Sequence, residues 1–237
     1  MRRKYLVFMT VIIAVVANSC MTGMQTPNEL TRAQEREGWM LMFDGETTDG
    51  WRGYNSDSFP ETGWTVDDGT LFFSGRGGDI IYDQKFGNFH FKLEWRISVN
   101  GNSGIFYLAE ERPGAPIWHT GLEYQLLDNE GHPDAKQGVD GNRMSASLYD
   151  ILPAVPQNAN TPGEWNTAEI IVNNGRVTHR QNGVDVVEFE IGTAEWDEMV
   201  EKSKFNAELF GKAKEGYIGL QDHSDDIWFR NIMIREL

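Results

Sequence analysis

The stretch Phe-His-Phe-Lys-Leu-Glu-Trp-Arg-Ile at residues 89–97 alternates strictly between apolar and polar side chains. Because successive side chains on a β-strand point to opposite faces, this pattern predicts a strand with one apolar and one charged face. Residues 122–126 and 218–223 alternate in the same way. We therefore expect three strands that each send an apolar row into a core and present polar, chemically capable side chains on the other face.

Further strands are indicated by the same pattern on both sides of these segments. They are expected at residues 70–74, 80–82, 104–109, 165–173, 176–181, 184–191 and 227–235. Asn174-Gly175 and Asn182-Gly183 predict two hairpins, because a type I′ turn needs a positive φ at both central residues. A three-stranded meander over residues 165–191 follows.

The arrangement of these strands predicts the fold class. No crossover helices alternate with the strands and no fixed repeat recurs, which disfavours parallel α/β folds and propellers. One helix is expected over residues 194–204, with Thr193 as its N-cap. We predict an all-β fold, a two-sheet antiparallel β-sandwich of the jelly-roll type with one short inserted helix. Residues 39–237 suffice for one core, so we expect a single domain there.

The N-terminus has the composition of an export signal. Arg2, Arg3 and Lys4 precede an apolar run over residues 5–17, which is shorter than the roughly 20 residues of a membrane-spanning helix. The run leads to Cys20, the only cysteine, at the position that a lipoprotein signal peptidase exposes. We predict a signal peptide at residues 1–19 and a flexible tether at 20–38 with a lipidated Cys20. Cleavage by the general signal peptidase, without lipidation, is the alternative.

This interpretation places the protein in the cell envelope. It would be anchored to the outer membrane by its lipid alone, facing either the periplasm or the cell surface. Removal of the three cations of the signal peptide takes the formal net charge from −15 to −18. Nucleic acid and anionic membrane surfaces are therefore disfavoured as partners, since both need clustered Lys and Arg. A net negative charge neither favours nor disfavours a sugar as the ligand.

Familiar catalytic motifs are missing from the sequence. A Gly-x-Ser-x-Gly elbow, a phosphate-binding glycine loop and a His-Glu-x-x-His zinc motif are all absent, which disfavours serine-nucleophile and zincin chemistry. Glu123 and Gln125 lie two residues apart on a predicted strand, so both side chains point the same way and can reach one ligand. A solvated strand face would show the same pattern.

Eight short segments carry a resemblance to a known family. They are Phe-Asp-Gly at 43–45, Gly-Asp-Ile-Ile at 78–81, Gly-Asn-Ser-Gly-Ile-Phe at 101–106, Gly-Leu-Glu-Tyr-Gln-Leu-Leu-Asp at 121–128, Gly-Glu-Trp-Asn-Thr at 163–167, Ser-Lys-Phe at 203–205, Gly-Leu-Gln-Asp-His at 219–223 and Trp-Phe-Arg-Asn-Ile at 228–232. In this order and spacing they resemble the 3-keto-disaccharide hydrolase family. The resemblance implies a concanavalin-like jelly roll and export as a lipoprotein, in agreement with the strand pattern and the N-terminus.

The activity that the resemblance implies is cleavage of the glycosidic bond in a sugar already oxidised to a ketone at carbon 3. Such a ketone acidifies the hydrogen on carbon 2. A base can remove that proton, the enolate expels the group on carbon 1, and water adds to the enone. This route needs a base, an electrophile for the enolate oxygen and an acid for the leaving group, and it needs no opposed pair of catalytic carboxylates.

Polar residues of the predicted strands and loops can be assigned to these roles. Glu123 and His223 are the candidate catalytic acid/base pair. The substrate-binding candidates are Gln125 and Gln221 for hydroxyl groups, Arg230 and Arg96 for enolate charge, and Glu94, Asn102 and Asp79. Structural roles compete with these: His223 can stabilise an acidic turn, Glu94 and Arg96 can form an ion pair, Asn102 can shape a strand entry, and Asp79 can cap the Gly77-Gly78 turn. The glycine-rich loop over residues 128–145 could fold over a ligand or be plain surface.

No cofactor is required by this route, although a divalent metal would be an effective clamp on an enolate. No segment has metal-ligand spacing, and Glu94, Glu123 and His223 could converge only if their strands are neighbours, so the metal ligands stay unassigned. The expected partners are an oxidised glycoside as substrate and a separate sugar oxidoreductase that supplies it.

The rival functions are a non-catalytic carbohydrate-binding lipoprotein and a surface scaffold without a ligand, because the same fold serves all three purposes. Catalysis predicts a concave pocket that holds both Glu123 and His223, at least one of them with a perturbed pKa. Binding alone predicts a flat groove with exposed Trp and no convergent acid/base pair.

Overall fold

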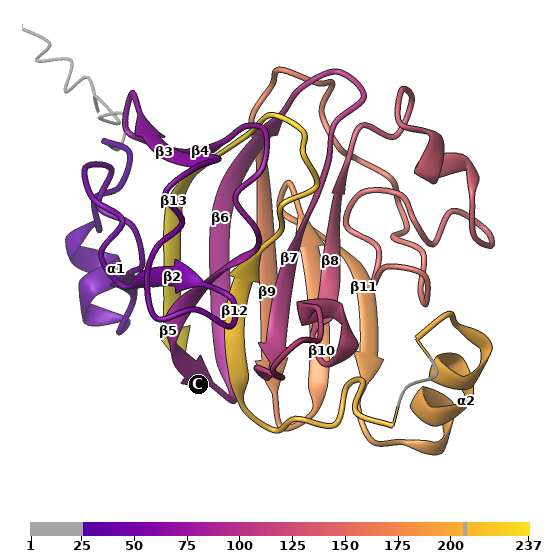
Figure 1. Ribbon diagram of the computed structural model, residues 1–237. Coiled ribbons are helices and arrows are strands. Elements are labelled where there is room, and N and C mark those ends of the chain that lie inside the picture. Colours follow the sequence, from indigo (N-terminus) through magenta and orange to yellow (C-terminus); the bar gives the residue numbers. More distant parts are fainter. Residues whose placement is uncertain (1–25, 206–207) are drawn as a thin grey trace, which may run out of the picture.

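Two antiparallel β-sheets pack face to face in the computed structural model, which describes residues 26–205 and 208–237 (Figure 1). The larger sheet has eight strands in the order β11-β10-β9-β6-β13-β4-β3, with β1 paired to β13, and the smaller has five in the order β2-β5-β12-β7-β8. The predicted β-sandwich is confirmed. The strands of the larger sheet are β1 (Met40–Leu41), β3 (Trp64–Asp67), β4 (Thr70–Phe73), β6 (Phe89–Ile97), β9 (Asn166–Asn173), β10 (Arg176–Gln181), β11 (Val184–Glu190) and β13 (Ile227–Glu236). Those of the smaller sheet are β2 (Trp51–Gly53), β5 (Ile80–Phe86), β7 (Asn102–Ala109), β8 (Leu122–Leu127) and β12 (Gly216–Leu220).

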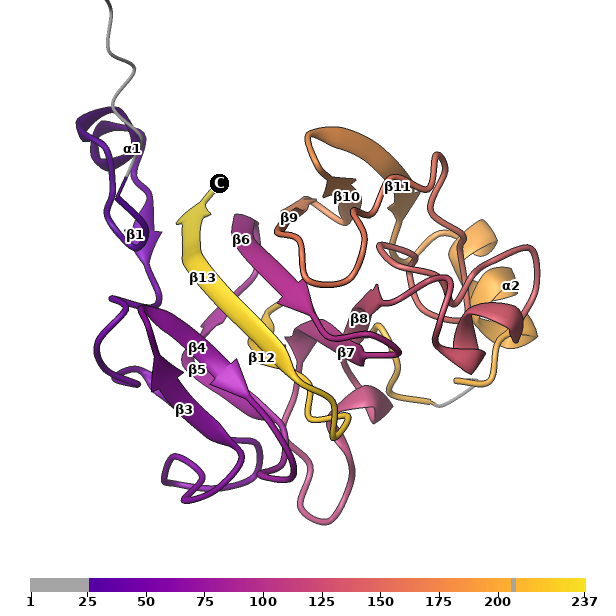
Figure 2. The same cartoon turned by 90° about the horizontal axis from the view of Figure 1, so that it is seen from above.

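Strand β6 lies in the middle of the larger sheet, between β9 and β13 (Figure 2). Its five apolar side chains are at most 2% exposed and belong to the main core between the sheets. Its polar side chains alternate with these and so point to the outer face. The alternation at residues 89–97 therefore separates core from outer surface, as predicted.

Both predicted hairpins are present. Asn174 and Gly175 have φ of 51° and 86°, and Asn182 and Gly183 have φ of 49° and 80°, as a type I′ turn requires. They join β9, β10 and β11 into a meander.

The predicted helix is α2 (Ala194–Lys202), two residues shorter than expected. The Thr193 hydroxyl accepts the backbone N–H of Trp196, which confirms the cap. Trp196 is fully buried and stacks between Phe189 and Phe210. This contact holds α2 and the segment after it against the end of the sandwich.

The glycine-rich loop after β8 is not a plain surface loop, because its continuation runs back along β8. The N–H groups of Ala146 and Tyr149 donate to the carbonyls of Gln125 and Glu123 at 2.8 and 3.0 Å. These bonds occupy the free edge of β8 and bring the loop over the outer face of the smaller sheet.

Strands β1, β2 and β3 were not predicted, and two further segments differ from the predictions. The strand expected over 218–223 ends at Leu220, because the next residues turn: Asp222 accepts the N–H groups of Gly77 and Gly78. The latter half of the predicted tether is folded. Helix α1 (Arg32–Arg36) begins with a capping box of Thr31 and Gln34, and Asn28 exchanges hydrogen bonds with Asn231 of β13. The polar composition of residues 26–38 concealed this short helix.

The predicted signal peptide, Cys20 and the first part of the tether lie outside the described residues. Within residues 26–205 and 208–237, no helix is long and apolar enough to cross a membrane. Helices α1 and α2 lie at opposite sides of the sandwich in both views (Figures 1 and 2).

Candidate functional site

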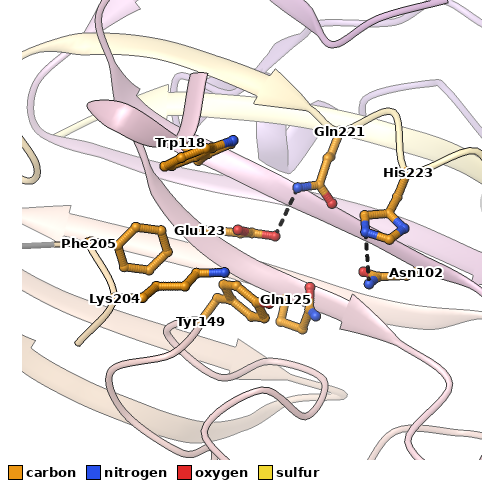
Figure 3. A pocket seen from close by; sticks show the side chains of 9 residues that line it. All are labelled: Asn102, Trp118, Glu123, Gln125, Tyr149, Lys204, Phe205, Gln221 and His223. Carbon is orange, nitrogen blue, oxygen red and sulfur yellow. Dashed lines mark hydrogen bonds between the residues drawn. The ribbon is translucent and has the colours of Figure 1, made fainter. Parts of the chain in front are cut away.

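A pocket of about 290 Å³ lies on the outer face of the smaller sheet, beneath the loop after β8 (Figure 3). Its lining residues are Asn102, Trp118, Glu123, Gln125, Tyr149, Lys204, Phe205, Gln221 and His223. The predicted acid/base pair and three of the predicted binding residues therefore meet in one cavity. The volume is at the small end of the roughly 300–1,000 Å³ of ligand pockets, which fits one sugar ring better than a polymer.

Glu123 lies near the middle of the pocket on strand β8. Its neighbours Leu122 and Tyr124 point into the core, so its own side chain points to the pocket. Diagonally across on β7 lies Gly104, which pairs with Gln125 and where a Cβ atom would come within 2.5 Å of Glu123 Oε1. The glycine leaves room for the carboxyl group to lie over the neighbouring strand, and a larger residue would make this group shift.

The carboxyl group of Glu123 is almost completely removed from water. The residue is 5% exposed, and its Oε1 accepts a hydrogen bond from Gln221 Nε2 at 3.2 Å. Burial raises the pKa of Glu123 to about 8, and the positive charge of Lys204 partly opposes this rise in pKa. At neutral pH the Glu123 carboxyl group is therefore protonated in most molecules. Once ionised, it is a stronger base than an exposed carboxylate.

Around Glu123 lie three amide side chains whose oxygens have no hydrogen-bond partner within residues 26–205 and 208–237. These buried atoms are Asn102 Oδ1, Gln125 Oε1 and Gln221 Oε1. Each amide nitrogen is engaged, with His223 Nε2, the Arg143 carbonyl and Glu123 Oε1 respectively. Buried polar atoms are nearly always paired in folded proteins. Three free acceptors in one cavity therefore fit a ligand that brings several O–H groups.

Lys204 supplies a positive charge on the side of Glu123 away from His223 (Figure 3). Its Nζ lies 4.2 Å from the centroid of the Tyr149 ring, and its backbone N–H donates to Asp150 Oδ2. Desolvation lowers the pKa of Lys204. The ammonium group makes no ion pair within 4.0 Å among the described residues, so it is available to a ligand.

Two aromatic residues form the apolar part of the wall. Trp118 lies in the 3₁₀ helix η1 (Ile117–His119), is 43% exposed, and has its ring centroid 6.4 Å from that of Phe205. A half-exposed indole beside hydrogen-bonding groups is typical of sugar sites, where it covers the apolar face of a pyranose.

Three predicted binding residues lie on the opposite side of the molecule. Glu94 and Arg96 of β6 and Arg230 of β13 belong to the outer face of the larger sheet. Arg230 Nε donates to Glu94 Oε2 at 2.7 Å. The guanidinium groups of Arg96 and Arg230 both lie over the ring of Trp165. The structure thus gives these side chains partners of their own and does not bring them to the pocket.

Asp79 lies next to the pocket and does not line it. Its Oδ1 accepts the backbone N–H of Asp222 at 2.9 Å, and burial raises its pKa to about 6. The Gly77-Gly78 turn is capped by Asp222 and not by Asp79.

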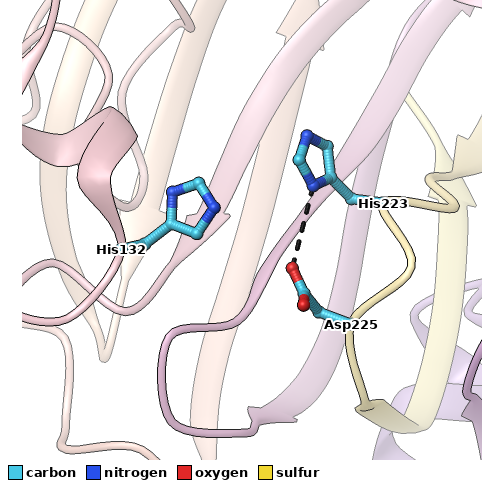
Figure 4. Close-up of side chains that lie close together, drawn as sticks. All are labelled: His132, His223 and Asp225. Atoms are coloured by element: carbon cyan, nitrogen blue, oxygen red, sulfur yellow. Dashed lines mark ion pairs between the residues drawn. The ribbon is translucent and has the colours of Figure 1, made fainter.

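One cluster of the described residues has the composition of a metal site: His132, His223 and Asp225, whose ligand atoms lie within 4.8 Å of one another (Figure 4). Glu94 and Glu123 take no part in it.

Sequence patterns missed Lys204, Tyr149, Trp118 and Phe205. They belong to loops, to the single turn of η1, or to the segment after α2, where no period marks a face. Lys204 and Phe205 lie within the Ser-Lys-Phe segment quoted above, which was the one available signal.

Comparison with known proteins relates the chain to enzymes that act on 3-keto sugars. The chain matches the family model of 3-keto-alpha-glucoside-1,2-lyase-like domains over residues 38–235. It is 45% identical over 232 residues to the 3-keto-disaccharide hydrolase of Bacteroides thetaiotaomicron, covering 86% of this chain and 80% of that protein.

Solved structures agree. A candidate glycosyl hydrolase from Parabacteroides distasonis matches with a TM-score of 0.83 and 30% identity, covering 90% of this chain and all of that one. A Bacillus subtilis protein of unknown function with a galectin-like fold matches with a TM-score of 0.50 and 14% identity, covering 78% of this chain and 89% of that one, which shows the fold alone.

Replacing Glu123 by Gln should stabilise the protein in a pH-dependent way. The folded pKa of about 8 lies above the ordinary 4.5, so the contribution of Glu123 to stability is complete below pH 4.5 and is lost as the pH rises through 8. Glu123→Gln removes this loss, worth roughly 5 kcal/mol. We expect its Tm to exceed that of the wild type by several degrees at pH 9 and by much less at pH 5.

Thermal unfolding at both pH values measures the effect. Glu130→Gln, at an exposed carboxylate of the same loop region, is the control and should not change the pH dependence. Equal Tm differences for Glu123→Gln at pH 5 and pH 9 would contradict the burial of its charge.

Proposed function

The chain belongs to the family of 3-keto-alpha-glucoside-1,2-lyase-like domains, and from this membership and the pocket we propose that it cleaves the glycosidic bond of 3-keto glycosides. The observation that carries the proposal is Glu123, a desolvated carboxyl group among three unpaired amide oxygens. A disaccharide oxidised at carbon 3 of one ring is the substrate class that fits, since the Bacteroides thetaiotaomicron relative is named for it.

Glu123 acts as the base in this proposal. It removes the proton from carbon 2, and the electron pair of that C–H bond forms the enolate, whose charge lies on the oxygen of carbon 3. The enolate then re-forms the ketone and expels the oxygen on carbon 1, which leaves an enone. Water adds at carbon 1, a proton returns to carbon 2, and the net reaction is hydrolysis. Because the base must be ionised, kcat/KM should rise with pH up to about 8.

His223 and Lys204 flank this base on two sides. Gln221 lies between Glu123 and His223, and Lys204 approaches Glu123 from the other side (Figure 3). Carbons 1, 2 and 3 are adjacent in the ring, so a base at carbon 2 has one neighbour at carbon 1 and the other at carbon 3. We assign His223 to the carbon 3 oxygen, which carries the enolate charge. Lys204 is assigned to the leaving oxygen on carbon 1, to which it donates a proton. The lowered pKa of Lys204 makes it a better proton donor than an ordinary lysine.

The reaction is tested by incubating the purified protein with 3-keto disaccharides and with their unoxidised parents. We expect release of the second sugar from the keto substrates alone, and Glu123→Gln should reduce this at least a hundredfold. In D₂O the product should carry deuterium at carbon 2, after correction for exchange of the product alone. Equal cleavage of keto and parent sugars would refute the proposal, and binding without turnover would favour the carbohydrate-binding alternative.

The role of Lys204 predicts a dependence on the leaving group. Lys204→Met should lower kcat/KM at least a hundredfold for a 3-keto disaccharide, whose alkoxide leaving group needs a proton. The loss should be small for a 3-keto 4-nitrophenyl glycoside, because nitrophenolate leaves without protonation. Arg230→Gln, on the outer face of the opposite sheet, is the control and should leave both rates unchanged. Equal losses for both substrates with Lys204→Met would refute the assignment.

We also propose that the protein works in the cell envelope, attached by a lipid on Cys20, and that a separate sugar oxidoreductase supplies its substrate. The basic and apolar residues before Cys20 support the anchor. The proposed reaction begins from a sugar that already carries the ketone, and none of its steps is an oxidation, which supports a separate source for the ketone. Cells fed an alkynyl fatty acid should label the wild type and not Cys20→Ser; labelling of both would refute the anchor.

A further inference from the structure

A cluster of two imidazoles and one carboxylate lies at the end of the pocket that holds His223 (Figure 4). His223 Nδ1 lies 3.7 Å from Asp225 Oδ2, and the centroids of the rings of His132 and His223 are 5.9 Å apart. Separations of this size leave room for an ion of about 2 Å bond length between the ligand atoms. The proposed reaction uses only His223 of these three residues.

Asn102 connects this cluster to the pocket. Its backbone N–H donates to Asp225 Oδ2 at 3.0 Å, and its side-chain nitrogen lies 3.4 Å from His223 Nε2. Its Oδ1 is buried, has no partner among the described residues, and belongs to a side chain that is 3% exposed and lines the pocket. A buried amide oxygen on a side chain that contacts His223, in a residue whose backbone contacts Asp225, is an independent sign of a cation site, because amide oxygens are common ligands of divalent ions.

We propose that His132, His223 and Asp225 bind a divalent transition-metal cation at the edge of the pocket. Two histidines and one carboxylate leave coordination positions open, which is the composition of sites for Mn²⁺, Fe²⁺ or Zn²⁺ that also bind a substrate oxygen. The carboxylates of Asp128 and Asp134 also face His132, and their negative charge favours a cation there. Asn102 Oδ1 can contribute a further ligand or bond to a metal-bound water.

Hydrogen bonds around His132 limit the expected affinity. Its Nδ1 accepts the backbone N–H of Asp134 at 3.1 Å, so Nε2 is the nitrogen left for the cation. A neutral imidazole that ligates through Nε2 carries its proton on Nδ1 and loses this bond, which reduces the affinity by roughly a factor of ten. We expect a dissociation constant in the micromolar range.

The cation deepens the role assigned to His223, and this part rests on the proposed function. Bound to His223, it faces the oxygen of carbon 3 and stabilises the negative charge that this oxygen gains when Glu123 takes the proton from carbon 2. His223 is then a ligand and not a proton donor. No electron transfer is involved, and the proton balance of the reaction is unchanged.

Metal binding can be tested without any substrate. Untagged protein is stripped with EDTA, dialysed, and titrated with Mn²⁺ while the electron paramagnetic resonance signal of free Mn²⁺ is followed, and with Zn²⁺ by calorimetry. We expect one site, weakened at least tenfold by His132→Asn and by Asp225→Asn. His132→Asn retains an acceptor for the Asp134 N–H and so preserves the local turn. His119→Asn is the matched control, because His119 lies outside the cluster, and it should bind as the wild type does.

The outcomes separate the cation from the proposed function. Absence of binding at millimolar metal, or equal binding by wild type and both cluster variants, would overturn the metal site. If keto disaccharides are cleaved at the same rate with EDTA and by His132→Asn, the cation has no part in the reaction although the proposed function stands. Binding that depends on the cluster, in a protein that cleaves no keto glycoside, would support the site and refute the function.

Discussion

The pocket around Glu123 depends on strand β8 having two buried faces. An antiparallel strand at the edge of a sandwich ordinarily has one face in the core and one in water. In β8 the segment around residues 144–152 returns along the free edge and closes over the outer face, so Glu123 and Gln125 are as buried as Leu122 and Tyr124. Water is thereby removed from the Glu123 carboxyl group, which takes no part in the core between the sheets. The altered acidity of Glu123 and the unpaired amide oxygens both follow from this coverage.

Such coverage opposes stability, which is typical of functional sites. A buried carboxyl group and three acceptors without a partner among the described residues each cost free energy. Gly104 adds a local cost, because a glycine within a strand contributes no side chain to packing. The sandwich beneath offsets these costs with a large apolar core, in which Trp95, Phe229 and Trp196 are almost completely buried. A ligand that brings hydroxyl groups supplies the missing partners.

Much of the fold follows from periodicity alone, and the site only in part. Alternation in residues 89–97 and the two Asn-Gly turns predict the central strand and the meander correctly, because both signals are local. Glu123 and Gln125 were found in the same way. The same pattern predicts correctly that Arg96 is polar and points outward. It does not tell whether a residue lies on the outer face of the larger or of the smaller sheet, because the order of the strands decides this.

Loop residues escape such reasoning for a related reason. Lys204 reaches the pocket because Trp196 holds helix α2 on the core and because Asp150 accepts the Lys204 N–H. The second of these contacts joins segments far apart in the chain, and neither follows a period in the sequence. His132 approaches His223 in the same manner, from the loop after β8, whereas Asp225 belongs to the same loop as His223 between β12 and β13.

Asn28 packs against β13, where its side-chain oxygen accepts the Asn231 N–H. Its side-chain nitrogen donates to the Gly69 carbonyl in the turn between β3 and β4. A chain from Cys20 to Asn28 can span at most roughly 30 Å, so a lipid on Cys20 would keep the domain within about one molecular diameter of the bilayer. Lys204 and Phe205 follow α2, on the side of the sandwich away from α1 (Figure 2). The start of the described chain and the pocket residues Lys204 and Phe205 thus lie toward different sides of the sandwich. A lipid anchor at Cys20 would therefore leave the pocket open to small sugars that diffuse along the envelope.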